Sequence, residues 1–164
     1  MVISFVIAVI LIGLDQLTKY LATVHLAPAG VHPLLPGIME LRYVRNDGAA
    51  FSLLANASWG RMFLIVVTAV ALVGLAVWFI KMKPSAWWER CTFILIFSGG
   101  LGNWIDRVLH GSVVDFFATT FMDFAIFNVA DCFVCIGAAL FVLLVLRQEL
   151  STAKAKGDSP KKPV

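Results

Sequence analysis

The stretch MFLIVVTAVALVGLAVWFI, residues 62–80, decides the fold because it contains no charged side chain. A helix of about 20 apolar residues crosses the hydrocarbon core of a bilayer. Three further apolar runs of similar length lie at about 2–26, 87–105 and 128–146. The whole chain is 60% hydrophobic and 14% charged, which is far from the composition of a soluble domain. We therefore predict an all-α membrane protein with four transmembrane helices.

The first apolar run has a second interpretation, a cleaved signal peptide, because Ala27-Pro28-Ala29 is similar to a cleavage site. Against it, the run lacks a basic beginning, exceeds the apolar part of a signal peptide, and contains Asp15 and Lys19. We expect this run to remain in the protein as its first helix.

Basic residues gather in the link between the second and third runs and after the fourth run. They are Lys81, Lys83 and Arg90, and then Arg147, Lys154, Lys156, Lys161 and Lys162. By the positive-inside rule, this link and both termini are expected on the cytoplasmic side. The loops at about 27–61 and 106–127 then face outward. We predict a single integral membrane domain, residues 1–150, and a disordered basic cytoplasmic tail, residues 151–164.

The first outer loop contains a strand pattern within GIMELRYVRNDGAAF, residues 37–51. Met39, Leu41 and Tyr43 alternate with Glu40 and Arg42, which is typical of a half-buried β-strand. The following Asn-Asp-Gly at 46–48 indicates a turn. The sequence therefore predicts a small β element, an outward-facing β-strand platform on the membrane surface.

Polar residues from distant parts of the chain are expected at one depth, near the outer surface of the bilayer. At 1.5 Å per residue, Asp15 lies roughly 20 Å from the cytoplasmic end of the first helix. The third run ends at that level, the fourth run begins there, and the loop between them returns to it. The other polar residues that meet there are Asn103, Asp106, Arg107, Asp115, Asn128 and Asp131.

Each of these residues also has a purely structural interpretation. Asp15 and Lys19 share a helix face and can neutralise each other in a low dielectric. Asp106 and Arg107 can form an ordinary interfacial pair, and Asn46 can be a turn residue. Three glycines of the third run, Gly99, Gly100 and Gly102, can simply allow helices to pack closely. The agreement in depth nevertheless favours a shared site.

Three aspartates, Asp115, Asp123 and Asp131, follow one another at eight-residue steps in VVDFFATTFMDFAIFNVADCF, residues 113–133. An ionised carboxylate that leaves water without a partner costs several kcal/mol. Two carboxylates close together share one proton, so the ionised one activates water and the protonated one hydrogen-bonds a scissile carbonyl. The pattern is compatible with aspartic protease chemistry and leaves open which two acids form the pair.

Five blocks of sequence resemble the lipoprotein signal peptidases (signal peptidase II), polytopic aspartic proteases of the bacterial inner membrane. The blocks are DQLTK at 15–19, NDGAAF at 46–51, GGLGNWIDR at 99–107, VVDF at 113–116 and FNVAD at 127–131. The resemblance covers nearly the whole chain apart from the tail. It implies a location in the bacterial inner membrane, with the active site at the outer leaflet.

The resemblance also implies roles for individual residues. Asp115 and Asp131 match the catalytic aspartates, which activate water. The implied substrate is a diacylglyceryl-modified prolipoprotein, cut just before its lipidated cysteine. The supporting residues implied in the same way are Asn46, Gly48, Asn103, Asp106, Arg107, Asn128, Asp15 and Lys19. Asp123 matches no motif residue, so we expect it to be a solvated loop charge.

The partners expected from this reading are the prolipoprotein substrate and membrane lipid. We expect no metal, no other cofactor, no nucleic acid and no obligate protein partner.

Three alternatives remain. The C-x-x-C at 132–135 is typical of thiol oxidoreductases, but the other cysteine, Cys91, is expected at the far end of the third helix. A proton-coupled carrier would place acids throughout the membrane, whereas residues 62–80 contain none. Aspartates can bind a divalent cation, but no ligand spacing supports this and His110 stands alone.

Overall fold

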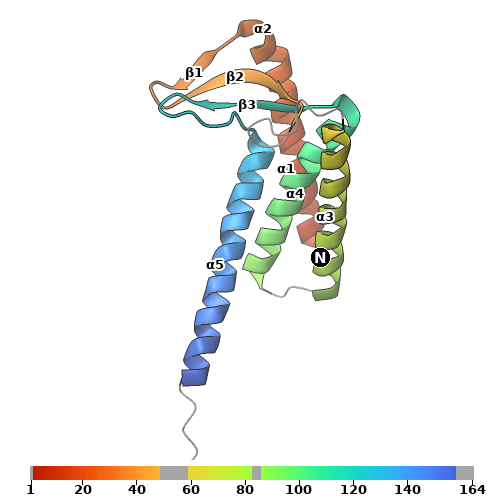
Figure 1. Ribbon diagram of the computed structural model, residues 1–164, viewed down its shortest axis with the longest axis vertical. Coiled ribbons are helices and arrows are strands. Elements are labelled where there is room, and N and C mark those ends of the chain that lie inside the picture. Colours follow the sequence, from red (N-terminus) through yellow and green to blue (C-terminus); the bar gives the residue numbers. More distant parts are fainter. Residues whose placement is uncertain (1, 49–58, 83–85, 158–164) are drawn as a thin grey trace, which may run out of the picture.

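The computed structural model describes residues 2–48, 59–82 and 86–157 of the chain. Each apolar run of the sequence corresponds to one long helix. These are α1 (Val2–Leu21), α3 (Gly60–Met82), α4 (Trp87–His110) and α5 (Val129–Gly157). Helix α1 continues into a π-helical turn, η1 (Ala22–Leu26), and a short helix, α2 (Ala27–Ala29). Figure 1 shows the long helices as a bundle with a small sheet lying across one end.

The bundle is organised around α4, which contacts α1, α3 and α5. At the end of the bundle away from the sheet, Phe93 of α4 stacks on Phe79 of α3 with ring centroids 3.9 Å apart. Ala8 of α1 and Ile94 of α4 complete this buried cluster. The hydrophobic contacts that fix the helices thus lie at the opposite end from the polar residues discussed below.

Three helical segments are long and apolar enough to cross a membrane: Val2–Ala29, Gly60–Lys81 and Val129–Ser151. They confirm three of the four predicted spans. Helix α4 does not qualify, because its C-terminal half mixes apolar residues with glycines and with Asn103, Asp106 and Arg107. A helix surrounded by others does not need an apolar surface all round, since its polar side chains face protein and not lipid.

Two glycines of α4 set how closely its neighbours approach. A Cβ atom at Gly99 would overlap the carbonyl oxygen of Ala130 on α5. A Cβ atom at Gly102 would overlap the carboxylate of Asp15 on α1. The structural role considered for these glycines is therefore present, and it serves to bring three helices together beside the polar residues.

The sheet has three antiparallel strands in the order β1-β2-β3, namely β1 (His32–Leu35), β2 (Met39–Asn46) and β3 (Val113–Thr119). The strand predicted from the alternation that starts at Met39 is confirmed, and as β2 it becomes the centre of the sheet. We expected Asp115 in the loop at 106–127, which is wrong, because Asp115 lies in β3. Apolar and polar residues do not alternate in VVDFFAT, so periodicity did not identify this strand.

Helix α5 continues past residue 150, where a disordered tail was expected to begin, and residues 151–157 are helical. Residues 158–164 lie outside the described residues, as do Ala49, Ala50 and Phe51 of the NDGAAF block.

Candidate active site

Asp115 is held where β3 pairs with β2. Its partner across the ladder is Val44, and Asn46 pairs with Val113. The side-chain amide of Asn46 donates a 2.9 Å hydrogen bond to Asp115 Oδ2. Asp115 is only 3% exposed, so a carboxylate on the predicted outer platform is nevertheless shielded from water.

Asp131 lies in the first turn of α5, where its carboxylate takes part in capping the N-terminus of the helix. Asp131 Oδ2 accepts a 3.0 Å hydrogen bond from the backbone N–H of Asn128. In return, the backbone N–H of Asp131 donates to Asn128 Oδ1, also at 3.0 Å. This reciprocal pair is a capping box, and the positive end of the helix dipole favours a negative charge at Asp131.

Asn128 connects the two acids. Its side-chain Nδ2 donates to Asp115 Oδ1 at 2.6 Å, while its backbone N–H donates to Asp131. The orientation of the Asn128 amide is fixed, because its oxygen already accepts the Asp131 N–H. Asn128 is fully buried, and its hydrogen bonds link the carboxylate of Asp115 to the carboxylate of Asp131.

Asn103 of α4 supplies the second donor to Asp131. Its Nδ2 donates to Asp131 Oδ1 at 2.8 Å. Its Oδ1 accepts hydrogen bonds from Lys19 Nζ at 2.8 Å and from Asn128 Nδ2 at 3.1 Å. The side-chain amides of Asn103 and Asn128 therefore each donate an N–H group to a carboxylate, that of Asp131 and that of Asp115 respectively.

A buried ionic network lies behind Asn103. Lys19 Nζ is 2.8 Å from Asp15 Oδ2 and 2.8 Å from Asp106 Oδ2, so one cation serves two acids. Asp15 and Lys19 do neutralise each other, as the structural interpretation held. Asp15 also crosses to α5, where its Oδ1 accepts the backbone N–H of Ala130 at 3.0 Å. The network thus ties α1 and α4 to the residue next to Asp131.

A hydrogen bond between Arg107 and Gly48 connects α4 to the segment that follows β2. Arg107 Nη2 donates to the carbonyl of Gly48 at 2.9 Å, and Nη1 donates to the carbonyl of Asn103 at 3.2 Å. The backbone N–H of Gly48 donates to Asn46 Oδ1 at 3.0 Å, which is the predicted turn. Because that oxygen is occupied, the Asn46 amide presents its N–H to Asp115.

A cavity of about 520 Å³ lies against both aspartates. Its polar lining consists of Asn46, Thr68, Asn103, Arg107, Asp115 and Asp131. Its apolar lining consists of Gly100, Val113, Phe124, Ala125, Ile126, Phe127, Cys132, Val134 and Cys135. Five of the predicted site residues do not line this cavity: Asp15, Lys19, Gly48, Asp106 and Asn128.

The environment of Asp115 favours its protonated form. Its pKa is raised to about 6, chiefly by burial and also by the negative charge of Asp131. The hydrogen bonds from Asn46 and Asn128 and the charge of Lys19 act in the opposite direction. A carboxyl group whose pKa is raised to about 6, close to a second carboxyl group at a helix N-terminus, is an arrangement in which two acids can share one proton.

Asp123 does not join this group. It is exposed in the segment after β3, as expected of a solvated loop charge.

Two residues of the candidate site were not predicted from the sequence, Gln16 and Thr68. Gln16 donates to Asp106 Oδ1 at 3.1 Å and to the carbonyl of Gly102 at 3.2 Å. Its only signal was its place between Asp15 and Lys19 in the DQLTK block. Thr68 of α3 lines the cavity, and within the uncharged stretch 62–80 only its hydroxyl group distinguished it in the sequence.

The two cysteines of the C-x-x-C lie far from the third cysteine. Cys132 and Cys135 line the cavity beside Asp131, while Cys91 belongs to the opposite end of α4. All three are free thiols. Within the described ranges 2–48, 59–82 and 86–157, no three His, Cys, Asp or Glu side chains form a candidate metal site.

Comparison with known proteins gives a consistent result. A family model described as "Signal peptidase (SPase) II" matches residues 7–147. A protein named lipoprotein signal peptidase from Streptococcus pyogenes serotype M2 is 42% identical over 142 residues, covering 86% of this chain and 91% of that protein. Its counterpart from serotype M5 is 41% identical with the same coverage.

Two solved structures are similar over most of the chain. A bacterial membrane enzyme determined by the in meso method at 2.3 Å resolution has a TM-score of 0.81 and 32% identity, covering 100% of this chain and 95% of that chain. A second, at 1.9 Å resolution, has a TM-score of 0.80 and 34% identity, with 89% and 94% covered.

Proposed function

Because the chain belongs to the signal peptidase II family and is an aspartic peptidase of the membrane, we propose that it cleaves diacylglyceryl-modified prolipoproteins just before the lipidated cysteine. The observation that carries the catalytic part of this proposal is Asn128, which donates hydrogen bonds to both Asp115 and Asp131. Two carboxylates held by one buried residue at the wall of a cavity suit a shared proton and a bound water.

Asp115 and Asp131 divide the work between them. Asp115 holds the shared proton, since its pKa is raised to about 6. We assign the role of base to Asp131, whose carboxylate accepts two N–H hydrogen bonds at the N-terminus of α5. Water then lies between an ionised acid and a protonated one, next to the carbonyl that is to be cut.

Hydrolysis follows in two steps. Asp131 takes a proton from water as the water oxygen bonds to the carbonyl carbon, and Asp115 gives its proton to the carbonyl oxygen. In the tetrahedral intermediate, Asp115 takes a hydroxyl proton back and the C–N bond breaks. Asp131 gives its proton to the leaving nitrogen, which becomes the free amine of the lipidated cysteine. Both acids then return to their starting states.

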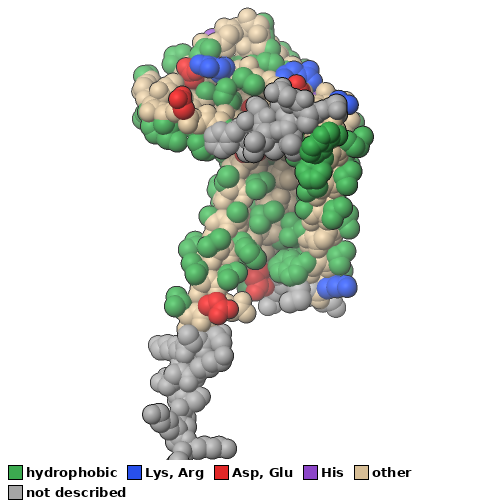
Figure 2. Space-filling view, in the orientation of Figure 1, with side chains coloured by type: hydrophobic (Ala, Val, Ile, Leu, Met, Phe, Trp, Pro, Cys, Tyr) green, Lys and Arg blue, Asp and Glu red, His purple; other side chains and the backbone are tan. Residues whose placement is uncertain are grey.

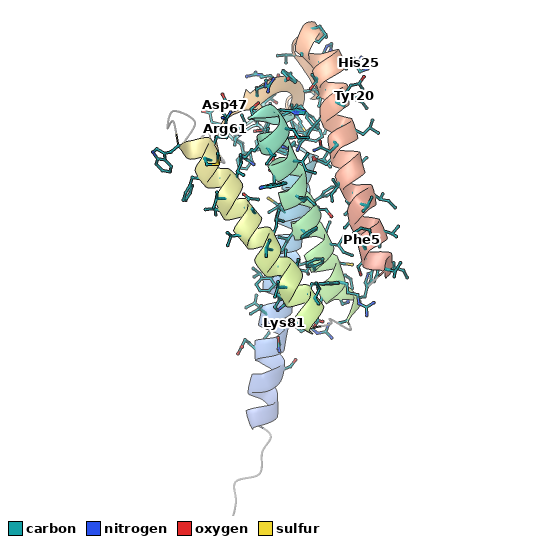
Figure 3. The ribbon with its side chains drawn as sticks, turned by 90° about the vertical axis from the view of Figure 1, so that its right-hand side faces the viewer. Phe5, Tyr20, His25, Asp47, Arg61 and Lys81 are labelled. Atoms are coloured by element: carbon teal, nitrogen blue, oxygen red, sulfur yellow. The ribbon has the colours of Figure 1, made fainter. Side chains whose placement is uncertain are left out.

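The proposed topology includes α4 as a fourth transmembrane helix, with both termini cytoplasmic and the sheet outside. Helix α4 has 24 residues and contacts the three apolar helices. Figure 3 shows Lys81 and Phe5 at the end of the bundle opposite the sheet, where the positive-inside rule puts the cytoplasm. The acids are then near the outer surface, where the scissile bond of a lipid-anchored peptide lies.

The cavity suits such a substrate because polar and apolar groups share its wall. Phe124, Ile126 and Phe127 face the same space as Asp115 and Asp131. A lipid-modified peptide brings an apolar chain and a polar amide to one point, and this wall can contact both. Backbone hydrogen bonds between Phe127 and Phe117 already occupy part of the edge of β3 that does not pair with β2.

The test uses purified enzyme and a prolipoprotein with and without its diacylglyceryl group. Mass spectrometry of the products should show one cut, immediately before the modified cysteine, in the lipidated substrate alone. Cleavage at another bond, or equal cleavage of the unmodified substrate, would contradict the proposed specificity. Complete loss of cleavage in EDTA, restored by a divalent cation, would contradict the two-acid chemistry.

A further inference from the structure

The far end of the sheet carries large apolar side chains of which about half of each is exposed. We call residues 31–38 and 120–122 the sheet tip. Six large apolar residues in it are between 45% and 64% exposed: Val31, Leu34, Leu35, Ile38, Phe121 and Met122. Contiguous exposed apolar groups on a protein surface mark a contact with a partner or a membrane.

The sheet tip is a built structure. The backbone N–H of Thr120 donates to the carbonyl of Ile38 at 3.0 Å, which joins its two segments. The Thr119 hydroxyl donates to the carbonyl of Met122 at 3.0 Å, and the N–H of Ile38 donates to the carbonyl of Leu35 at 2.9 Å. These hydrogen bonds hold the two segments next to each other at this end of the sheet.

The level of the sheet tip coincides with the end of the membrane-crossing segments. The apolar span of α3 has 22 residues and is about 33 Å long, which fills a hydrocarbon core of about 30 Å. Trp59, directly before α3, is 58% exposed, and Tyr20 is 64% exposed, as is typical of aromatic residues at a membrane surface. Figure 3 shows Tyr20 and Arg61 at the sheet end of the bundle.

Charge and apolar surface are separated on the sheet tip and its neighbouring strand. Figure 2 shows hydrophobic side chains along the lower edge of the sheet, toward the bundle, with acidic and basic side chains above them. Strand β2 contributes the ion pair between Arg42 and Glu40. Figure 1 shows the sheet extending sideways beyond α5, so this lower edge faces the space around the bundle.

We propose that the sheet tip inserts its apolar edge into the outer leaflet, with acyl chains of membrane lipid as its partner. The edge lies at the end of the bundle where α3 begins, and its six large apolar side chains are 45% to 64% exposed. Insertion would brace β3, and with it Asp115, against the bilayer. The proposal concerns a membrane contact and does not depend on the cleavage reaction.

The experiment measures depth with nitroxide labels in lipid nanodiscs. In full-length protein with Cys91, Cys132 and Cys135 replaced by alanine, single labels are attached at Leu34→Cys and Phe121→Cys. Val70→Cys, on the exposed face of α3, reports a membrane-embedded position, and Arg42→Cys reports the charged side of the sheet. The ratio of collisions with oxygen to collisions with a water-soluble nickel chelate gives the depth of each label.

Labels at Leu34 and Phe121 should give a ratio severalfold above that at Arg42, corresponding to about 5–10 Å below the lipid headgroups. Ratios equal to that at Arg42 would overturn the proposal. Spin–spin broadening between tip labels of different molecules would also overturn it, because a second copy would then cover the edge. The Val70 label calibrates a membrane-embedded position, and melting curves verify that each labelled protein is folded. The depth is measured without the cleavage assay, so an inactive variant still gives an answer.

Discussion

Lys19 and Asn103 are joined by a 2.8 Å hydrogen bond from the ammonium group of α1 to the amide oxygen of α4. An ammonium group can only donate, so it fixes the oxygen of Asn103 on its own side. The Nδ2 of Asn103 is thereby directed at Asp131. A residue that does not line the cavity thus sets the hydrogen bonding of an acid that does.

Replacing Lys19 by methionine should reduce both stability and kcat. Asp15 and Asp106 would remain buried without their cation, which costs about 3–5 kcal/mol. The Asn103 amide would lose the donor that fixes its orientation. Thermal melting and steady-state cleavage measure the two effects separately.

A second variant separates charge from orientation. Lys19→Met combined with Asp106→Asn removes one cation and one anion, so melting should recover in part while kcat stays low. Lys19→Arg keeps the charge and should retain more activity than Lys19→Met. If kcat recovered together with the melting temperature, Lys19 would have a neutralising role and nothing more.

Gly102→Ala should destabilise the protein by about 1–3 kcal/mol through overpacking. The new methyl group would displace the Asp15 carboxylate, which caps Ala130 next to Asp131. Gly74→Ala on α3 is the matched control, because a Cβ atom there meets nothing within 4 Å. The control should melt at or slightly above the wild-type temperature, and equal losses in both variants would refute the packing argument.

The raised pKa of Asp115 predicts a dependence of stability on pH. The folded protein binds the proton at a pKa of about 6 and the unfolded chain at 3.8, so stability falls as pH rises between these values. The contribution lost is on the order of 1–3 kcal/mol. Melting curves from pH 4 to 7 should show this decline in the wild type and a smaller one in Asp115→Asn. Asp123→Asn, at an exposed site, should follow the wild type.

Replacing Cys132 and Cys135 together by alanine should leave most of the cleavage activity. Both line the cavity, but neither contacts Asp115 or Asp131 through a described hydrogen bond. Small changes in KM are expected from the altered wall. Loss of all cleavage, with normal melting, would show that thiol chemistry belongs to the mechanism.

Much of the helical fold could be predicted from apolar runs, because a lipid solvent imposes a length and a composition on each span. Residues 62–80 fall within α3, and the alternation at 39–43 identified β2. The apolar run at 87–105 predicted helix α4, but the polar residues of this helix keep it from qualifying as a membrane span by composition. Strand β3 was not predicted, because its partner β2 is far away in sequence and local patterning does not encode such pairing.

Part of the candidate site could be predicted, because its polar residues were expected at the same depth in the membrane. Asp15, Asn103 and Asp131 were expected at one level. In the structure Asp15 accepts the N–H of Ala130, next to Asp131, and Asn103 donates to Asp131. It could not reveal which side of each amide faces an acid, nor that Asp15 caps Ala130 on another helix. Those details depend on side-chain orientation across three helices, which spacing in a sequence does not record.

The most direct test of the account compares three single variants, Asp115→Asn, Asp131→Asn and Asp123→Asn, in cleavage of a diacylglyceryl-modified prolipoprotein. All three replace an acid with its amide of nearly equal size, and melting curves verify that each is folded. The account predicts no detectable product from Asp115→Asn or Asp131→Asn and near wild-type turnover from Asp123→Asn. Activity in a folded Asp115→Asn or Asp131→Asn, or its loss in a folded Asp123→Asn, would contradict the assignment of the pair.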